Sequence, residues 1–405
     1  MGRSLVLPSR SPPISPGRKI LCTLALASLL AAGAVARAGA GDSGAGAGRH
    51  DLLRAALAQS GRKLVLTVRT AAPAPLAGLG RLPGRGASRH LCFELRRAGR
   101  RGLWLLCLGG PAAHRQIGVE LRNAAGKTVS RRTLAARVKR PRPDKLALAI
   151  DPAAAGLTPH RYRWRVLENR RGCNPRRCEE TLPGRGARAF RLRPVRAIGC
   201  SGGRAGAVRN GPREGDAVAL TFDDGPGPYT EAFLDVLRDK HVHATFFEIG
   251  QEASGRAAIM RRILREGHEI GNHTTHHGSY PGYWDMAATN ALIRSATHFE
   301  PCLFRPPGGA VDAAVVGAAG AAGMKTVLWD VDPSDWSNPG SAAVYSRVAG
   351  ATRSGSIVLM HDGGGDRSGT LAALPRIVDT LRRRGYRFAT VSELLGHRML
   401  YRPYG

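Results

Sequence analysis

Two adjacent carboxylates and two nearby imidazoles are the side chains of this chain best suited to hold a metal ion. Asp223 and Asp224 end an apolar run, and His273 and His277 lie four residues apart further along. Successive strand residues point to opposite faces, so neighbouring carboxylates can serve one site only where a strand ends and the backbone turns. Imidazoles four residues apart reach one face of a helical turn, and with a carboxylate they leave coordination positions open. The pattern predicts a catalytic divalent metal site.

Further polar and aromatic candidates follow in the order Arg305, Asp335, Trp336 and His361. An amide carbonyl is a poor electrophile, and a divalent cation would polarise it and lower the pKa of a bound water toward about 7. A carboxylate then removes the water's proton, and an acid must protonate the departing nitrogen. Such proton transfer typically accelerates a reaction about 10²- to 10⁴-fold. His361 suits the acid role if a carboxylate such as Asp335 supports its imidazolium.

The same spacing excludes one common zinc chemistry. Thr274 stands where the His-Glu-x-x-His motif of zinc proteases carries glutamate, so that mechanism is excluded. His276 is interpreted as a bystander between the two candidate ligands. Two imidazoles and one carboxylate suit Zn²⁺, and Co²⁺, Ni²⁺ and Mn²⁺ are alternatives for the same donor set.

These residues fall into five short motifs, and together the motifs resemble the polysaccharide deacetylases of the NodB type, carbohydrate esterase family four. The motifs are, in order, Thr221–Gly225, His273–His277, Arg305–Pro307, Asp332–Trp336 and Leu359–His361. The resemblance covers the C-terminal half only, and it implies a distorted (β/α) barrel with a metal-dependent deacetylase site.

The resemblance also implies individual roles. It makes Asp223 the general base and His361 the general acid, with Arg305 orienting the base and Asp335 beside the acid. The implied metal ligands are Asp224, His273 and His277.

The implied substrate-binding residues are Trp336, Leu359, Pro307 and Gly308. Trp336 would lie along the groove and Leu359 would line the acetyl pocket. Gly308 departs from the family, because many relatives carry an aromatic residue after the Pro-Pro pair. The substrate specificity of the family is therefore a weaker guide to this chain than the catalytic mechanism of the family is.

The fold class expected for the whole chain is α/β, with a smaller all-β sandwich-like domain before the barrel. Short runs rich in β-branched, aromatic or Leu residues predict a β-rich domain over residues 62–195. Strand-like and helix-like segments alternate over residues 217–398 and predict a parallel sheet with enough units to close. Residues 39–61 read as a linker ending in a helix-prone stretch, and residues 196–216 as a Gly-rich connector.

The net positive charge of the chain is confined to its N-terminal half. Residues 1–215 hold 42 Lys and Arg against 10 Asp and Glu, whereas residues 216–405 hold 19 against 20. Such a split is typical of a polyanion-facing segment joined to a neutral domain, although an Arg-rich solvated surface would give the same counts. Nucleic acid has no support beyond charge, because no zinc-finger spacing or aromatic-interleaved basic motif is present. An anionic wall polymer is the partner expected for this module.

The N-terminus has the pattern of an export signal. Basic residues precede an apolar run over residues 20–36, and small residues follow it. The run is at the short end for a membrane span, so cleavage of residues 1–38 is favoured over a retained anchor. We expect an extracellular or cell-wall location, with membrane contact only through residues 20–36 if they are kept.

Six cysteines remain beyond the predicted signal, which includes Cys22. An even number in an exported chain fits disulfides, although six cysteines allow fifteen pairings. Cys92 and Cys107 lie in two runs that could form a hairpin, Cys173 and Cys178 would close a small loop, and Cys200 and Cys302 remain.

The function expected is an exported deacetylase that acts on N-acetylated cell-wall polysaccharide, with peptidoglycan as the first choice. Chitin and acetylated xylan are alternatives within the same chemistry. A different class is a catalytically silent wall-binding protein that uses the barrel as a lectin-like platform.

Overall fold

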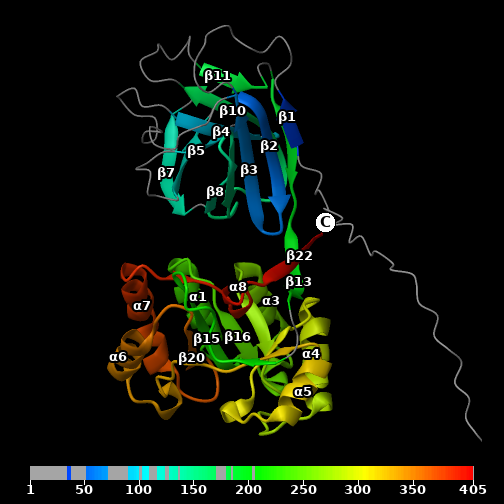
Figure 1. The fold of residues 1–405 in the computed structure, drawn as a ribbon, viewed down its shortest axis with the longest axis vertical. Coiled ribbons are helices and arrows are strands. Elements are labelled where there is room, and N and C mark those ends of the chain that lie inside the picture. The colour runs from blue at the N-terminus through cyan, green and yellow to red at the C-terminus, as the bar shows by residue number, and fades with distance from the viewer. Residues whose placement is uncertain are drawn as a thin grey trace, which may run out of the picture.

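A computed structural model describes residues 34–37, 52–71, 90–99, 103–108, 116–123, 127–135, 137–169, 179–183, 186–202 and 206–404. The chain forms an N-terminal β domain and a C-terminal α/β domain, which lie one above the other in Figure 1. Both halves of the expected fold class are confirmed.

The N-terminal domain consists of two antiparallel sheets. One sheet has the order β1-β2-β3-β9-β8, and the other has the order β11-β10-β4-β5-β6-β7 with β12 paired to β10. Their buried residues form one cluster that includes Leu57, Phe93, Leu106 and Trp164, so the sheets face each other across a shared core. The strands are β1 (Ala34–Arg37), β2 (Leu52–Ser60), β3 (Lys63–Thr70), β4 (His90–Arg97), β5 (Leu103–Leu108), β6 (Gln116–Arg122), β7 (Thr128–Ala135), β8 (Arg137–Arg142), β9 (Lys145–Ile150), β10 (His160–Asn169), β11 (Glu179–Leu182) and β12 (Arg188–Leu192).

The predicted linker over residues 39–61 is wrong at its C-terminal end. Leu52–Ser60 is strand β2, which pairs with β3 and buries Leu52, Ala55 and Leu57. Ala and Leu favour helix in isolation, but pairing with β3 and burial against the second sheet override that propensity.

The C-terminal domain has eight strands in one parallel sheet, in the order β14-β19-β18-β17-β16-β15-β20 with β21 paired to β15. A bridge between Val331 and Val358 connects the segment after β19 to β20 and closes the barrel. The strands are β14 (Ala207–Val208), β15 (Ala217–Gly225), β16 (Thr245–Glu248), β17 (Glu269–Asn272), β18 (Leu303–Phe304), β19 (Lys325–Val327), β20 (Ile357–His361) and β21 (Arg387–Phe388).

Helices cover the outside of this barrel. In α1, Phe233, Leu234 and Leu237 are fully buried on one face, as expected for a helix that packs on a sheet. The helices are α1 (Thr230–Asp239), α2 (Gly250–Ala253), α3 (Ala257–Glu266), α4 (Tyr283–Thr297), α5 (Ala313–Ala321), α6 (Ser341–Ala351), α7 (Ser368–Arg383) and α8 (Val391–Leu394), with 3₁₀ turns η1 (Pro307–Gly309) and η2 (Asp335–Ser337).

The predicted connector over residues 196–216 is largely ordered structure. Strand β13 (Val195–Ser201) pairs with β22 (Arg398–Pro403), the last strand of the chain, because both ends of the C-terminal domain meet at this point. A disulfide joins Cys200 in β13 to Cys302 just before β18. This pairing and Cys92–Cys107 between β4 and β5 are confirmed, whereas Cys173 and Cys178 lie outside the described residues.

The N-terminal domain meets the barrel at the starts of its strands. Arg62 lies against Gly267, just before β17, and Gly61 lies against the ring of Tyr401 in β22. Because the strands are parallel, their C-terminal ends, where the candidate catalytic residues lie, are at the opposite end of the barrel. The N-terminal domain therefore leaves the candidate site uncovered.

Of the predicted signal over residues 1–38, only Ala34–Arg37 is described, as strand β1 paired with β2. Within the described part of the chain, no helix is long and apolar enough to cross a membrane. The export signal and its alternative as an anchor stay predictions.

Candidate active site

Strand β15 delivers two carboxylates to its C-terminal end. Asp223 pairs in register with Phe247 and Gly225 pairs with Glu248, so Asp224 is an extra residue in a β-bulge with φ 70°. The bulge overrides the normal alternation of a strand, and both carboxylates come within 4 Å of His273. The backbone turn expected from the sequence is therefore present inside β15, one residue before its end.

The two candidate histidines follow β17, but the helical turn expected between them is wrong. Residues 273–277 have no helical structure, and Thr274 and His277 have φ values of 69° and 57°. Left-handed backbone at two non-glycine residues is uncommon, and here it turns both imidazoles toward Asp224. Their ring centroids lie 5.1 Å apart.

The geometry of these three residues fits a metal ion. Asp224 Oδ1 is 3.4 Å from His273 Nε2 and 3.3 Å from His277 Nε2, and it has no hydrogen-bond partner although it is buried. His273 Nδ1 lies 2.7 Å from the carbonyl oxygen of Arg305. A carbonyl can only accept, so Nδ1 carries a proton and Nε2 is the ring nitrogen that faces Asp224 and could coordinate a metal. One carboxylate oxygen and two imidazole nitrogens therefore converge on one point.

Charge in the cluster favours the ionised carboxylate. Burial alone would raise the pKa of Asp224, but His273 and His277 beside it hold that pKa well below its usual range. Gly364, with φ 71°, lies so close that a Cβ there would come within 2.5 Å of Asp224 Oδ2. The glycine leaves room for the carboxylate.

Asp223 is held by a buried guanidinium. Arg305 Nη1 donates to Asp223 Oδ1 at 2.7 Å and to Thr221 Oγ1 at 2.6 Å, and both charged side chains are almost fully buried. The backbone carbonyls of Val327 and Leu328 accept from the rest of the guanidinium. Arg305 therefore fixes the orientation of Asp223 and neutralises its buried charge, which leaves the other carboxylate oxygen free to accept a proton.

His361 and Asp335 form a second charged pair on the neighbouring strand. The register of β20 places His361 beside Asp223. Its Nδ1 lies 2.7 Å from Asp335 Oδ1. Burial lowers the pKa of His361, but Asp335, Asp223 and Asp224 outweigh that effect and raise the pKa overall. The imidazolium is therefore stabilised, as an acid that works near neutral pH requires.

Comparison with known proteins shows the family of the chain. A family model described as "Polysaccharide deacetylase" matches residues 210–327. A peptidoglycan-N-acetylglucosamine deacetylase of Bacillus cereus is 46% identical over 195 residues, which are 46% of this chain and 92% of the relative. The chain belongs to the polysaccharide deacetylase family.

Two further relatives extend the comparison of this polysaccharide deacetylase. A chitooligosaccharide deacetylase of Sinorhizobium fredii is 38% identical over 200 residues, covering 44% of this chain and 93% of the relative. A solved family 4 carbohydrate esterase from Streptomyces lividans, in complex with acetate, is 33% identical and has a TM-score of 0.42, covering 45% of this chain and 97% of the other.

The predicted substrate-binding residues lie around this polysaccharide deacetylase site with different exposure. Trp336 is 59% exposed at η2, directly after Asp335. Leu359 is buried on β20 two residues before His361, Pro307 is buried and Gly308 is exposed with φ 61°. Their roles stay predictions, as do those of the catalytic residues and metal ligands.

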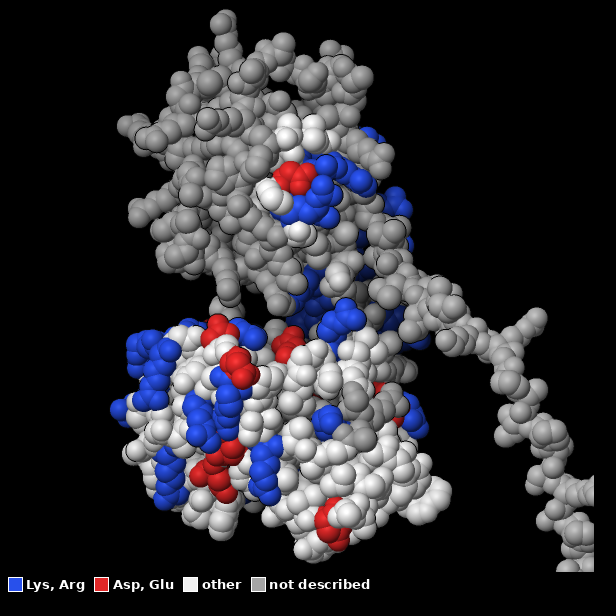
Figure 2. Space-filling view, viewed as in Figure 1, with Lys and Arg blue, Asp and Glu red and all other residues white. Residues whose placement is uncertain are grey.

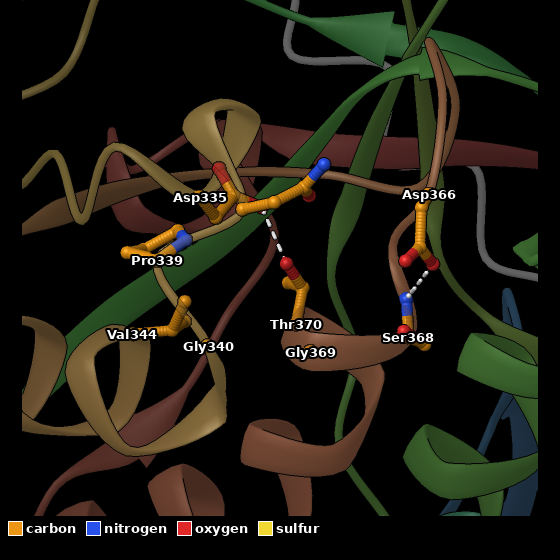
Figure 3. A pocket seen from close by; sticks show the side chains of 9 residues that line it. Asp335, Pro339, Gly340, Val344, Asp366, Ser368, Gly369 and Thr370 are labelled. Atoms are coloured by element: carbon orange, nitrogen blue, oxygen red, sulfur yellow. Dashed lines mark hydrogen bonds between the residues drawn. The ribbon is translucent and has the colours of Figure 1, made fainter.

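A small cavity lies on the far side of Asp335. It has a volume of about 150 Å³ between the first turns of α6 and α7, and Figure 3 shows Asp335 and Thr370 facing each other there. The hydroxyl of Thr370 donates to Asp335 Oδ2 at 2.9 Å, and the backbone N–H of His361 donates to the same oxygen at 3.0 Å. Both oxygens of Asp335 are therefore occupied, which fixes the carboxylate under His361.

Two buried acids behind the site lie outside the five motifs. Glu248 on β16 and Asp362 after β20 both lie within 3 Å of where a Cβ on Gly225 would be. Burial raises the pKa of Glu248 well above its usual range and that of Asp362 to about 7. Asp362 accepts a hydrogen bond from Thr230 and follows His361 directly, so its position in the sequence was the only available clue.

Proposed function

We propose that this chain is an exported, metal-dependent deacetylase that hydrolyses N-acetyl groups of amino-sugar polymers, with peptidoglycan as its substrate. The observation that carries the proposal is the convergence of Asp224, His273 and His277, whose ligand atoms lie within 4.8 Å of one another beside the Asp223–Arg305 pair. Two imidazoles and a carboxylate suit Zn²⁺, with Co²⁺, Ni²⁺ or Mn²⁺ as alternatives.

The charged pairs give each proton a route. A cation held by the three ligands would polarise the acyl carbonyl and acidify a water. Asp223, oriented by Arg305, removes a proton from the water that attacks the carbonyl carbon. When the C–N bond breaks, His361 gives its proton to the departing nitrogen, and Asp335 stabilises the imidazolium before that transfer. The products are acetate and a free amino sugar.

The choice of peptidoglycan rests on the relatives. The Bacillus cereus relative is named for peptidoglycan N-acetylglucosamine, and the Sinorhizobium fredii relative is named for chitooligosaccharide at lower identity. The deciding experiment measures acetate released from purified peptidoglycan, chitin oligomers and acetylated xylan, each with and without a chelator. We expect chelator-sensitive release from peptidoglycan. Acetate release from chitin oligomers or xylan alone would make that polymer the substrate in place of peptidoglycan. Acetate release that survives thorough chelation would contradict the metal dependence.

A silent wall-binding protein is the alternative from another class. The intact donor set and the two charged pairs argue for activity, because hydrolysis needs both an oriented carboxylate and a supported imidazolium, whereas polymer binding needs neither. Polymer binding that is unchanged in Asp223→Asn, in a protein that never releases acetate, would establish the silent alternative.

Export is part of the proposal. Its support is the basic and apolar pattern of residues 1–38 together with the two disulfides, since disulfides persist in oxidising compartments. Mass spectrometry of the protein from the producing cells would give its mature N-terminus. A chain that keeps residues 20–36 and fractionates with membranes would be anchored, and a reduced cytosolic chain would remove export from the proposal.

The N-terminal domain is proposed to hold an anionic wall polymer. Figure 2 shows basic side chains gathered on the described surface of this domain, whereas both signs mix over the C-terminal domain. On the outer face of the second sheet, Arg161 is directly opposite Arg191, and Arg163 is directly opposite Arg96. Like charges in such pairs are destabilising. Among the described residues, Arg161, Arg163 and Arg191 have no carboxylate within ion-pair distance, so an external polyanion would relieve the repulsion.

Charge reversal tests this surface. Arg161→Glu with Arg163→Glu should weaken binding to a polyol-phosphate polymer roughly ten-fold at low salt and flatten its salt dependence. Arg261→Glu with Arg265→Glu, at two exposed positions of α3, reverses the same number of charges and is the matched control. Equal losses in both variants would show that only net charge matters, and tighter binding to duplex DNA than to the wall polymer would contradict the choice of partner.

A further inference from the structure

Three exposed aromatic rings follow the metal-ligand turn within seven residues of His277. Tyr280 is 62% exposed, Tyr283 is 40% exposed and Trp284 is 81% exposed. The rings of Tyr283 and Trp284 make an edge contact with centroids 5.0 Å apart. Aromatic rings are usually buried, so a contiguous exposed group indicates a binding surface.

This segment is fixed at both ends although its rings face solvent. Pro281 is buried between the two tyrosines, and Met286 is fully buried in a cluster with Phe304 and Met324. Asp285 lies between Trp284 and Met286 in the first turn of α4. The exposure is therefore a property of an ordered segment.

The same segment is tied to the turn that holds the histidines. The Thr275 backbone N–H donates to Asp285 Oδ1 at 3.1 Å, and Thr275 Oγ1 donates to the Asp285 carbonyl at 3.0 Å. Thr275 lies midway between His273 and His277. Two hydrogen bonds thus set the position of Trp284 relative to the candidate metal ligands.

Tyr280 adds an independent argument from its backbone. Its φ is 51°, in the left-handed region that glycine adopts at little cost and bulky residues avoid. A ring that is mostly exposed gains little packing within the chain to offset that strain. Strained residues concentrate where a site needs them, and the other left-handed residues of this turn are Thr274 and His277.

From these observations we infer that Tyr280, Tyr283 and Trp284 form a platform for sugar rings of the glycan beyond the unit being deacetylated. The inference rests on the proposed function for its substrate class. The C–H face of a pyranose is apolar and its hydroxyls lie at the edge, so it stacks on an aromatic ring while the hydroxyls stay hydrated. Trp336, exposed beside Asp335, lies on a different loop of the same end of the barrel, so the platform extends the aromatic surface along the polymer.

Binding of oligomers of different length tests the platform in the full-length protein. The probes are the dimer and hexamer of N-acetylglucosamine, titrated calorimetrically with Zn²⁺ into protein that carries Asp223→Asn, so that neither ligand is consumed. Trp284→Ala should weaken the hexamer roughly 3- to 10-fold and leave the dimer unchanged. Tyr404→Ala, which removes an exposed ring on the last residues of the chain, is the matched control and should change neither.

Tyr280→Gly separates binding from folding. Glycine relieves the left-handed strain, so this variant should melt at the same or a higher temperature while it binds the hexamer more weakly. Unchanged hexamer affinity in both Trp284→Ala and Tyr280→Gly would overturn the platform, as would equal loss for dimer and hexamer. Failure of the parent protein to bind the hexamer would overturn it too. If Trp284 contributes to hexamer binding but the protein with Asp223 intact releases no acetate, the platform stands and the proposed function is overturned.

Discussion

Asp335 accepts two hydrogen bonds from His361, one from ring Nδ1 at 2.7 Å and one from the backbone N–H at 3.0 Å. The first bond fixes the ring tautomer, so that Nε2 is the nitrogen left to exchange a proton with substrate. The second bond fixes the strand end that carries the ring. One carboxylate therefore sets both the protonation and the position of the candidate acid.

Replacement of that carboxylate should change the pH profile as well as the rate. Asp335 is the main group that raises the pKa of His361 against the opposing effect of burial. The imidazolium is the working form of an acid, so activity falls as pH rises through this pKa, and Asp335→Asn should move that alkaline limb to lower pH. We expect turnover to fall about 10²-fold, measured as acetate release across pH. If the alkaline limb of the pH profile stays in place in Asp335→Asn, a group other than His361 is responsible for it.

Arg305 should be needed for both stability and turnover. Arg305→Met leaves Asp223 buried without its partner, and breaking a buried ion pair by removing one side typically costs about 3 to 5 kcal/mol. Urea unfolding measures that loss, and bound metal should remain because none of the three ligands is changed. Arg305→Lys restores the charge without the planar fork and should recover part of the stability. Full turnover in Arg305→Met would show that Asp223 needs no orienting group.

Much of the C-terminal domain could be predicted because its chemistry and its folding use the same local patterns. Asp223, His273 and His361 each lie at the C-terminal end of an apolar strand or directly after it. The order of the motifs in the sequence therefore follows the order of the strands around the barrel. The helical turn at His273 was wrong because spacing alone cannot reveal the left-handed backbone of Thr274 and His277. Glu248 was missed because a buried acid without a motif looks like any strand residue.

The N-terminal domain was harder to predict because its strands depend on partners. Leu52–Ser60 is rich in Ala and Leu, and only pairing with β3 makes it extended. Strand β7 carries two arginines in its centre, which hide the alternation of a half-buried strand. Its sheet neighbours, not its composition, determine its structure.

Loss of one imidazole should remove metal and activity together. His273→Ala deletes a donor whose lone pair is aimed by the Arg305 carbonyl, so we expect at least about a 100-fold loss of turnover with loss of bound metal. Metal analysis of the purified protein and acetate release give the two readouts. His276→Ala is the control, because His276 is exposed and its ring forms a hydrogen bond to Gln251 and to no other described residue. Retention of metal in His273→Ala would show that the ligand set is misassigned.

Glu269 should make the folded protein less stable as pH rises toward neutrality. Burial raises the pKa of this side chain from 4.5 to about 7, and Ser392 is its main hydrogen-bond partner. The folded state therefore holds its proton more tightly than the unfolded state does. The resulting stability is complete below about 4.5 and is lost as pH rises to about 7, by roughly 3 kcal/mol at most. Glu269→Gln keeps the contacts to Ser392 and removes this titration, so its free energy of unfolding in urea should fall less between about pH 5 and about pH 8 than that of the parent protein.

Glu300→Gln, at an exposed ion pair, is the control and should keep the pH dependence of stability of the parent protein. An unchanged pH dependence in Glu269→Gln would assign the buried titration to another group.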